Sequence, residues 1–393
     1  MKIGFLFNHS VAHQVAHSLP IAAALARFHP SVELTIFVCG GESEAEVRRL
    51  WAAFGFSETD QRISALTPPS LTSKFLAKAS GDALPAERIS ILYRNVSRFR
   101  SLDALVVPEK TSTILKTRLG LNHLALIHTR HGAGDRAIGF DAASGRFDLV
   151  LLSGRKILRR LDEAGLLQPN GHAIVGYPKF DAVLDLPCDP VFQNDRPTVV
   201  YNPHPSPALS SWYRLGPQIL EWFAVQDRFN LIFAPHVMLF ARKLTVGLSP
   251  FSVSTVPDVP SAAENLSHIH IDKGSAKSVD MSYVRAADIY LGDASSQVYE
   301  FLIEPRPCIF LNPNGHDWQG NPDFAHWQAG PVVDNLDEMK TALVNSLMAP
   351  TAFGGTQEEL FAESFDLTDQ PSSQRAADAI VSWLGRNRQD NQC

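Results

Sequence analysis

Long hydrophobic runs and closely spaced cysteines are both missing from this sequence of 393 residues. No stretch reaches about 18 consecutive apolar residues, the length that a membrane-spanning helix requires, so the sequence predicts no such helix. The cysteines lie too far apart for a metal-binding pair or a disulfide framework: Cys39, Cys188, Cys308 and Cys393. Because free cysteines persist where thiols stay reduced, we expect a cytoplasmic protein.

The sequence also has no zinc-ligand spacing, no aromatic RNA-binding signature and no Asp-x-Asp pair. His9, His13 and His17 would lie on one stripe if the first helix began early, because residues four apart share a helical face. No nearby cysteine or carboxylate completes a metal site with them. We therefore expect no nucleic-acid partner, no metal and no tightly bound cofactor.

The residues that are present indicate a soluble globular protein, with 45% apolar and 19% charged residues. The length exceeds that of one ordinary core and predicts two domains. Residues 185–197 are rich in turn-forming residues, so a boundary is expected there. We expect a first domain at 1–190, a second at 191–370, and a C-terminal helix within 371–393 that could cross back to the first domain. Residues 1–7 predict a strand rather than a signal peptide.

Short apolar runs alternate with helical patterns, which predicts parallel sheets with helices on both faces. The expected fold class is α/β, with two doubly wound Rossmann-like domains facing a cleft. Residues 62–84 contain two adjacent prolines and are expected to form a loop, and residues 381–387 are expected to close a last helix. Strands are expected at residues 3–7, 32–39, 104–107, 124–127, 149–152, 173–175, 198–201, 230–234, 268–271, 289–291 and 308–311.

The stretch Thr-Arg-His-Gly-Ala-Gly-Asp-Arg at 129–136 is the most informative part of the sequence. It follows a predicted strand, and ligands in open α/β sheets bind beyond the carboxyl ends of the strands. His131 can move a proton near neutral pH, and Asp135 is a further candidate catalytic residue. The alternative is a solvated turn with a structural histidine. The candidate binding residues of this stretch are two glycines, which let a ligand approach the backbone closely, and two arginines, which can pair with a phosphate: Arg130, Gly132, Gly134 and Arg136.

Two more candidates follow predicted strands of the first domain. His9 lies at the first strand-to-helix turn, where it would face a ligand. Lys179 lies in the sequence Gly-Tyr-Pro-Lys-Phe-Asp, in which the proline stiffens a turn and the lysine can meet a phosphate. The alternative for this second segment is a turn between the domains.

Polar residues also follow the strands of the second domain. His236 ends the run Leu-Ile-Phe-Ala-Pro-His and is a candidate catalytic residue, with a structural histidine as the alternative. Residues 292–296, Gly-Asp-Ala-Ser-Ser, join a strand to a helix N-terminus that can hold a phosphate, with ordinary serine capping as the alternative. The candidate nucleotide-binding residues are Asn202, His204, Ser275, Asp293, Ser295, Ser296 and Glu300.

The net charge of −6 is unevenly distributed. Residues 1–190 carry 22 basic and 18 acidic residues, whereas residues 191–393 carry 13 and 23. The basic group of the first half is expected in a helix on which Arg94 and Arg98 share a face. It is either a solvated face or a contact for a phosphorylated or membrane-bound acceptor. The group consists of Arg88, Arg94, Arg98 and Arg100.

The order of these motifs over residues 120–385 resembles that of the CDP-glycerol glycerophosphotransferases, the family of teichoic acid polymerases and primases. The resemblance rests on His-Gly at 131–132, Gly-x-Pro-Lys-x-Asp at 176–181, Tyr-x-Pro at 201–203, Pro-His at 235–236 and Asp-x-Ser-Ser-x-x-x-Glu at 293–300. It implies a GT-B-like fold. It also implies that His131 is the catalytic base, that His236 lies near the donor phosphates, that the serine pair contacts the pyrophosphate, and that Glu300 lies near the ribose.

The sequence departs from the family pattern at Arg130, where the family has Trp, and at Ala133, where it has Thr. Three functions therefore stay open. The first is transfer of glycerol phosphate from a CDP-activated donor to an acceptor hydroxyl at the inner face of the cell membrane, with a lipid-linked acceptor as one alternative. The second is a GT-B glycosyltransferase that uses a nucleotide sugar. The third is a nucleotide-sugar epimerase or a non-catalytic nucleotide-binding protein.

Overall fold

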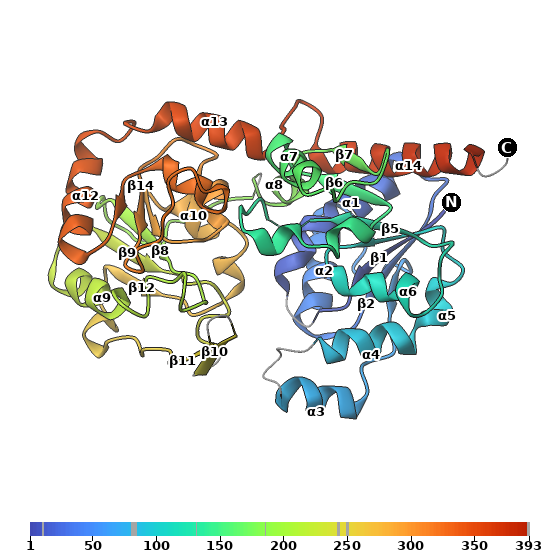
Figure 1. The fold of residues 1–393 in the computed structure, drawn as a ribbon, viewed down its shortest axis with the longest axis horizontal. Coiled ribbons are helices and arrows are strands. Elements are labelled where there is room, and N and C mark those ends of the chain that lie inside the picture. Colours follow the sequence, from blue (N-terminus) through green and yellow to red (C-terminus); the bar gives the residue numbers. More distant parts are fainter. Residues whose placement is uncertain are drawn as a thin grey trace. The chain divides into compact units, whose positions relative to one another are not determined.

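The computed structural model describes residues 1–9, 12–79, 85–130, 132–184, 186–241, 244–248 and 251–390 (Figure 1). It divides into two compact units. Unit 1 comprises Met1–Ala133, Ile138–Leu186 and Ala362–Cys393, and unit 2 comprises Gly134–Ala137 and Pro187–Phe361. The chain therefore passes from one unit to the other four times.

Unit 1 is built on a seven-stranded sheet in which all neighbouring strands run parallel. The strand order β3-β2-β1-β4-β5-β6-β7 is that of a doubly wound fold, and its direction reverses between β1 and β4. Every residue of β4 and β6 is buried, as expected for strands covered on both faces. The strands are β1 (Lys2–Phe7), β2 (Glu33–Val38), β3 (Ile63–Ala65), β4 (Ala104–Val107), β5 (Ala125–Thr129), β6 (Leu149–Leu152) and β7 (His172–Ile174).

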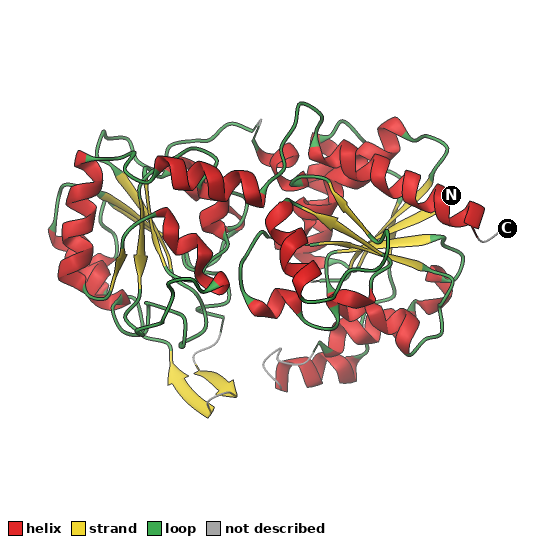
Figure 2. Cartoon of the chain, turned by 45° about the horizontal axis from the view of Figure 1, so that its top comes forward, coloured by secondary structure: helices red, strands yellow, loops and turns green. Residues whose placement is uncertain are grey.

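Helices cover both faces of this sheet (Figure 2). The last helix, α14, packs against α1 and α8, so the C-terminal segment belongs to the core of unit 1. The α-helices are α1 (Val15–Phe28), α2 (Gly41–Ala53), α3 (Leu71–Ala79), α4 (Ala86–Arg94), α5 (Val96–Phe99), α6 (Ile114–Thr117), α7 (Arg155–Glu163), α8 (Pro178–Val183) and α14 (Ser372–Asp390). The 3₁₀ turns are η1 (Ala12–Gln14), η2 (Lys110–Thr113), η3 (Ala137–Phe140) and η4 (Ser144–Arg146).

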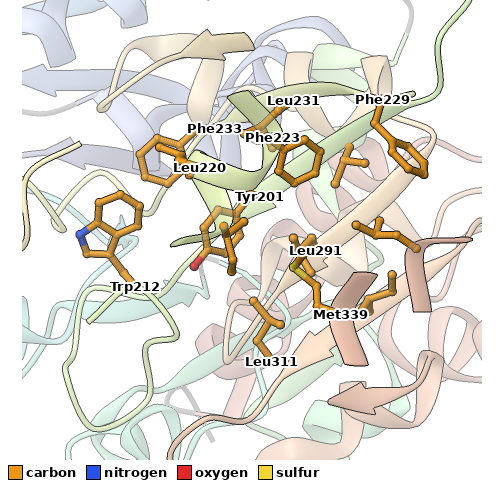
Figure 3. Close-up of a cluster of buried hydrophobic side chains, with 14 of the residues drawn as sticks. Tyr201, Trp212, Leu220, Phe223, Phe229, Leu231, Phe233, Leu291, Leu311 and Met339 are labelled. Carbon is orange, nitrogen blue, oxygen red and sulfur yellow. The ribbon is translucent and has the colours of Figure 1, made fainter. Parts of the chain in front are cut away.

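Unit 2 repeats the same topology with a six-stranded parallel sheet in the order β12-β9-β8-β13-β14-β15. Its direction reverses between β8 and β13. A cluster of buried side chains packs against this sheet, including Tyr201, Trp212 and Phe233 (Figure 3). The strands are β8 (Thr198–Asn202), β9 (Asn230–Phe233), β12 (Ile269–Ile271), β13 (Ile289–Gly292), β14 (Cys308–Leu311) and β15 (Val332–Val333).

The other elements of unit 2 surround this sheet or project from it. Strands β10 (Leu244–Leu248) and β11 (Phe251–Thr255) form a separate antiparallel hairpin. The helix α13 (Gly354–Ser364) contains the last passage from unit 2 to unit 1. The remaining helices are α9 (Gly216–Val225), α10 (Ser282–Ala286), α11 (Gln297–Phe301), α12 (Leu336–Met348), η5 (Ser261–Ala263), η6 (Ala276–Ser278) and η7 (Pro322–Ala329).

The fold class expected from the sequence, two doubly wound α/β domains, is confirmed. The expected loop at 62–84 is wrong, because this region contains both β3 and α3. The two prolines precede α3 rather than interrupt it. Ser70 then caps the helix, since its Oγ accepts a hydrogen bond from the backbone N–H of Ser73 at 3.2 Å. The last helix, α14, runs from Ser372 to Asp390 and includes residues 381–387.

Two expected helical faces do not form. The histidine stripe needs a helix that begins near residue 9, but α1 begins at Val15, so His9 lies before it and only His17 lies within it. The stripe of Arg94 and Arg98 needs one continuous helix, but α4 ends at Arg94 and α5 begins at Val96. The buried side chain of Asn95 breaks the helix because it bonds both backbone groups of Thr67, at 2.8 and 2.9 Å.

Candidate functional site

The candidate site lies at the carboxyl edge of the sheet of unit 2, where the strand order reverses. His204 follows β8 and Asp293 follows β13, the two strands on either side of the reversal. His236 follows the neighbouring strand β9. In open α/β sheets the reversal point opens a crevice between the loops that leave the two strands, and ligands bind there.

Asp293 joins the loops on either side of this point. Its carboxylate accepts hydrogen bonds from the backbone N–H of His204 at 2.8 Å and from the backbone N–H and hydroxyl of Ser211 at 2.6 and 2.8 Å. The side chain is fully buried, and burial raises the pKa of Asp293 to about 6 against the lowering effect of these hydrogen bonds. Asp293 therefore fixes the loop after β8, and its carboxylate is not exposed to solvent.

His204 is held between two donors. Its Nε2 lies 2.6 Å from Nη1 of Arg136, and its Nδ1 accepts the backbone N–H of Ser206 at 3.0 Å. Burial first, then the positive charge of Arg136, lowers the pKa of His204 well below its usual value. The ring is therefore neutral, and its one acceptor nitrogen takes the hydrogen bond of Arg136 or of Ser206, according to the tautomer.

His236 lies beside His204, with 6.0 Å between the ring centroids. Its Nδ1 accepts the backbone N–H of Met238 at 3.2 Å, which places the proton of the neutral ring on Nε2. Burial and the charge of Arg136 lower the pKa of His236 to about 4. Two neutral imidazoles and one guanidinium thus meet at this edge, and together they offer N–H donors with a net positive charge.

Arg136 reaches this edge because residues 134–137 belong to unit 2 although they follow a strand of unit 1. The anchor of this segment is Asp135, which is 3% exposed. Its carboxylate accepts the Tyr299 hydroxyl at 2.7 and 2.9 Å and contacts Nδ1 of His326 at 2.8 Å. Gly134 lies so close to Ser296 that a Cβ at position 134 would come within 3.1 Å of the serine Cβ. In this structure Asp135 holds the segment 134–137 in place through hydrogen bonds. Its expected catalytic role stays a prediction.

The serine turn after β13 leads into α11, which has only five residues. Ser296 is its N-cap and is exposed, but its side chain makes no capping hydrogen bond. Ser295 is 5% exposed, and its hydroxyl accepts the backbone N–H of Gln297 at 3.3 Å. Glu300 is buried on the same helix. The exposed Ser296 beside Gly134 is the part of this turn that a ligand could reach.

Two more predicted residues of unit 2 have structural partners. Asn202 donates to the backbone oxygen of Ala234 at 2.6 Å and ties the end of β8 to the end of β9. Ser275 is exposed after β12 and donates to Asp272. Burial raises the pKa of Asp272, but the hydrogen bonds of Ser275 and Tyr283 outweigh it and lower the pKa to about 2.

The other predicted residues lie in unit 1 or outside the described residues. His9 follows β1, and Gly132 has the positive φ of 75° that glycine adopts readily. Arg130 turns into unit 1, where its Nη1 donates to the backbone oxygen of Gly139 at 2.9 Å and burial lowers its pKa to about 10. Lys179 lies in α8 and is 4% exposed. His131 lies outside the described residues.

The residues that sequence reasoning missed are Ser211, Tyr299 and His326. Each contacts a residue that it did single out, Asp293 or Asp135, but from a distance of 82 to 191 residues along the chain. Only Tyr299 carried a signal, because it lies within the serine motif. Within the described residues, no group of three or more His, Cys, Asp or Glu side chains could hold a metal ion.

No family model matches the sequence, and no curated protein matches it. Solved structures do match its fold. The wall teichoic acid polymerase TagF aligns with a TM-score of 0.59 and 12% identity over 98% of this chain and 89% of TagF. The chain has the GT-B fold. Two epimerase structures support the same statement. UDP-GlcNAc 2-epimerase from Neisseria meningitidis, bound to UDP-GlcNAc, has a TM-score of 0.56 and 11% identity over 98% of this chain and all of that one. The S. aureus protein MnaA with UDP has a TM-score of 0.59 and 13% identity over 98% and 97%.

Proposed function

We propose that this chain is a transferase that binds a nucleotide-activated donor at the carboxyl edge of unit 2. The observation that carries the proposal is the contact of Arg136 with His204 beside His236 at the point where the strand order reverses. The guanidinium of Arg136 carries five N–H donors in a planar fork, and the contact with His204 at 2.6 Å uses one of them. A phosphate oxygen beside this pair would accept from the guanidinium, in the charge-assisted geometry that arginine favours, and from the Nε2–H of His236.

The neutral state of both histidines supports a role as donors to the phosphates. Because burial and Arg136 keep the rings unprotonated near pH 7, each can donate one N–H without adding a buried positive charge. Such preorganised donors stabilise the negative charge that grows on a leaving nucleotide. The structures similar in fold, which include TagF soaked with CDP-glycerol and an epimerase with UDP-GlcNAc, give further support for a nucleotide-activated ligand.

CDP-glycerol is the donor we favour, because of the motif order in the sequence. In this step an acceptor oxygen forms a bond to the β-phosphorus, the bond between that phosphorus and the bridging oxygen breaks, and CMP leaves with the electron pair. The hydroxyl proton passes to His131, the proposed general base. With a nucleotide sugar the same site would release a nucleoside diphosphate from the anomeric carbon.

Calorimetric titration with CDP-glycerol, CDP, UDP-GlcNAc and UDP tests the donor site. Replacing Arg136 by alanine removes a charge-assisted hydrogen bond, so we expect nucleotide affinity to decrease about 10- to 100-fold. Arg228→Ala is the matched control, because Arg228 is an exposed arginine before β9, at the opposite edge of the same sheet. An unchanged nucleotide affinity in Arg136→Ala would show that the nucleotide does not bind at this edge.

The His131→Ala variant tests the chemical step separately from binding. Loss of a general base lowers kcat about a hundredfold or more, whereas the donor affinity should stay within a few-fold. The products identify the reaction: CMP with acceptor present for glycerol phosphate transfer, a nucleoside diphosphate for glycosyl transfer, and an epimerised nucleotide sugar without any acceptor for an epimerase. Normal turnover by His131→Ala would contradict the assignment of the base.

A further inference from the structure

The helix α3 of unit 1 carries its large apolar side chains on the outside. Leu71, Phe75 and Leu76 are 83%, 73% and 53% exposed, whereas the small residues Ser73 and Ala77 are 7% and 3% exposed. A helix that packs on a globular protein normally buries its large apolar residues and exposes its polar ones. The pattern of α3 is the reverse, so packing within unit 1 does not explain these side chains.

The orientation of α3 is fixed by contacts with its neighbour α4. Ser73 and Ala77 are four residues apart and form one stripe, and α3 packs against α4. At the start of the helix, the backbone N–H of Ser70 donates to the hydroxyl of Ser90 on α4 at 3.0 Å. Figure 1 shows α4 between α3 and the strands of unit 1. Leu71 and Phe75, also four apart, are therefore held on the outer side of the pair.

The charge around this apolar face is basic. The sequence of α3, LTSKFLAKA, contains two lysines and no acidic residue, and Lys74 is exposed. Arg94 is also exposed and lies one turn beyond Ser90 on α4, and its neighbour Tyr93 is 46% exposed. Exposed leucine and phenylalanine flanked by basic and aromatic residues are the composition of helices that lie in the interface of an anionic bilayer.

A second copy of the chain fits this face less well than a bilayer does. Each partner of a stable dimer covers about 800 Å², more than the outer side of a nine-residue helix offers. A symmetric contact would also bring the basic residues of the two copies together. Nor can α3 cross a membrane, since nine residues span about 14 Å of a hydrocarbon core about 30 Å thick. No helix in the described part of the chain is long and apolar enough for that.

We propose that the outer face of α3, formed by Leu71, Lys74, Phe75 and Leu76, is a membrane-contact surface that lies in the headgroup region of an anionic bilayer. The apolar side chains would enter the boundary of the acyl chains while Lys74 and Arg94 stay at the phosphates. This surface belongs to the described residues of unit 1 alone, so the proposal holds or fails independently of the nucleotide site.

Co-sedimentation of the full chain with vesicles tests the surface. We expect binding to vesicles of phosphatidylcholine with phosphatidylglycerol, weaker binding to phosphatidylcholine alone, and a decrease as salt rises. The double variant Leu71→Ser with Phe75→Ser should lower the affinity more than about tenfold, and Lys74→Glu should lower it at low salt. The matched control replaces Val225 and Met348, 86% and 81% exposed in unit 2, by serine and should bind as the wild type does.

Three outcomes would overturn the proposal. The wild type fails to bind anionic vesicles, the double variant binds them as well as the wild type does, or the control loses as much affinity as the double variant. Sedimentation equilibrium without lipid tests the alternative that a second copy of the chain covers this face. If the wild type self-associates, the double variant does not, and neither binds vesicles, then α3 is a dimer contact. Because the replaced side chains are exposed, the thermal unfolding of the variants should match that of the wild type.

Discussion

Burial acts in opposite directions on the ionisable side chains at the carboxyl edge of unit 2. It raises the pKa of Asp293 to about 6 and lowers that of His236 to about 4, because in each case the charged form is the one that loses hydration. Near pH 7 the site consequently contains neutral histidines, one permanent cation, Arg136, and the largely ionised carboxylate of Asp293, which already accepts hydrogen bonds from His204 and Ser211. An anion is the ligand that such a set of donors attracts.

The low pKa of His236 predicts a specific dependence of stability on pH. Its folded pKa is below the unfolded value of about 6.5, so its contribution is full above pH 6.5 and is lost as pH decreases through 4. Between pH 7.5 and 4.5 this amounts to about 2 to 3 kcal/mol. Urea unfolding at the two pH values should show a smaller loss of stability in His236→Asn than in the wild type.

Asp293 provides the control of opposite sign. Its folded pKa is higher than its unfolded pKa, so Asp293 adds stability at low pH that is lost as pH rises through about 6. Asp293→Asn removes this contribution, and the variant should therefore lose more stability than the wild type between pH 7.5 and 4.5. Equal pH dependence in the wild type and His236→Asn would show that His236 is not a buried neutral ring.

Among the secondary-structure elements, the break between α4 and α5 depends on one side chain. Asn95 is 1% exposed and bonds both backbone groups of Thr67 and the backbone oxygen of Ile91. It thereby joins this helix pair to the segment after β3. Arg98 adds to the same junction, because it donates to the backbone oxygen of Ala65 and to the hydroxyl of Ser64.

Replacement of Asn95 by alanine should therefore lower the free energy of unfolding by about 2 to 3 kcal/mol, because three hydrogen bonds are lost and buried groups of Thr67 stay unpaired. Denaturant unfolding measures the change. Asn345→Ala, at an exposed position of α12, is the comparison and should stay within about 0.5 kcal/mol. A cost for Asn95→Ala no larger than that of the comparison would show that the junction holds without this side chain.

The elements that sequence reasoning located well are those whose signal is local. The apolar runs at β4, β6 and β14 have the expected bounds because fully buried strands leave an uninterrupted hydrophobic pattern. The break at Asn95 was missed because it depends on Thr67, 28 residues away. The site shows the same division. His204, His236 and Asp293 follow local strand signals, whereas the pairing of Asp135 with His326 depends on two segments 191 residues apart.

Considered as a whole, the molecule has two hydrophobic cores that interleave in sequence. Ile380 of α14 is 0% exposed and belongs to unit 1, although it follows the whole of unit 2 in the chain. Leu343 of α12 is equally buried in unit 2. Position in the sequence is therefore a poor guide to which core a substitution affects.

Calorimetric unfolding can separate the two cores. We expect Ile380→Ala and Leu343→Ala each to cost about 2 to 5 kcal/mol, because both leave a cavity. Ile380→Ala should lower the transition of unit 1 and Leu343→Ala that of unit 2. If both variants shift one shared transition to the same extent, the two units unfold as a single cooperative body.

The placement of residues 134–137 in unit 2 also bears on synthesis at the ribosome. Arg136 emerges 68 residues before His204, and Asp135 emerges 191 residues before His326. A nascent chain that has completed the strands of unit 1 therefore carries a charged pair whose partners do not yet exist. Until the ribosome has passed residue 326, the loop after β5 must stay hydrated, and only then can water leave the carboxylate of Asp135. Asp135 is thus synthesised long before Tyr299 and His326, the residues that hold it in the folded protein.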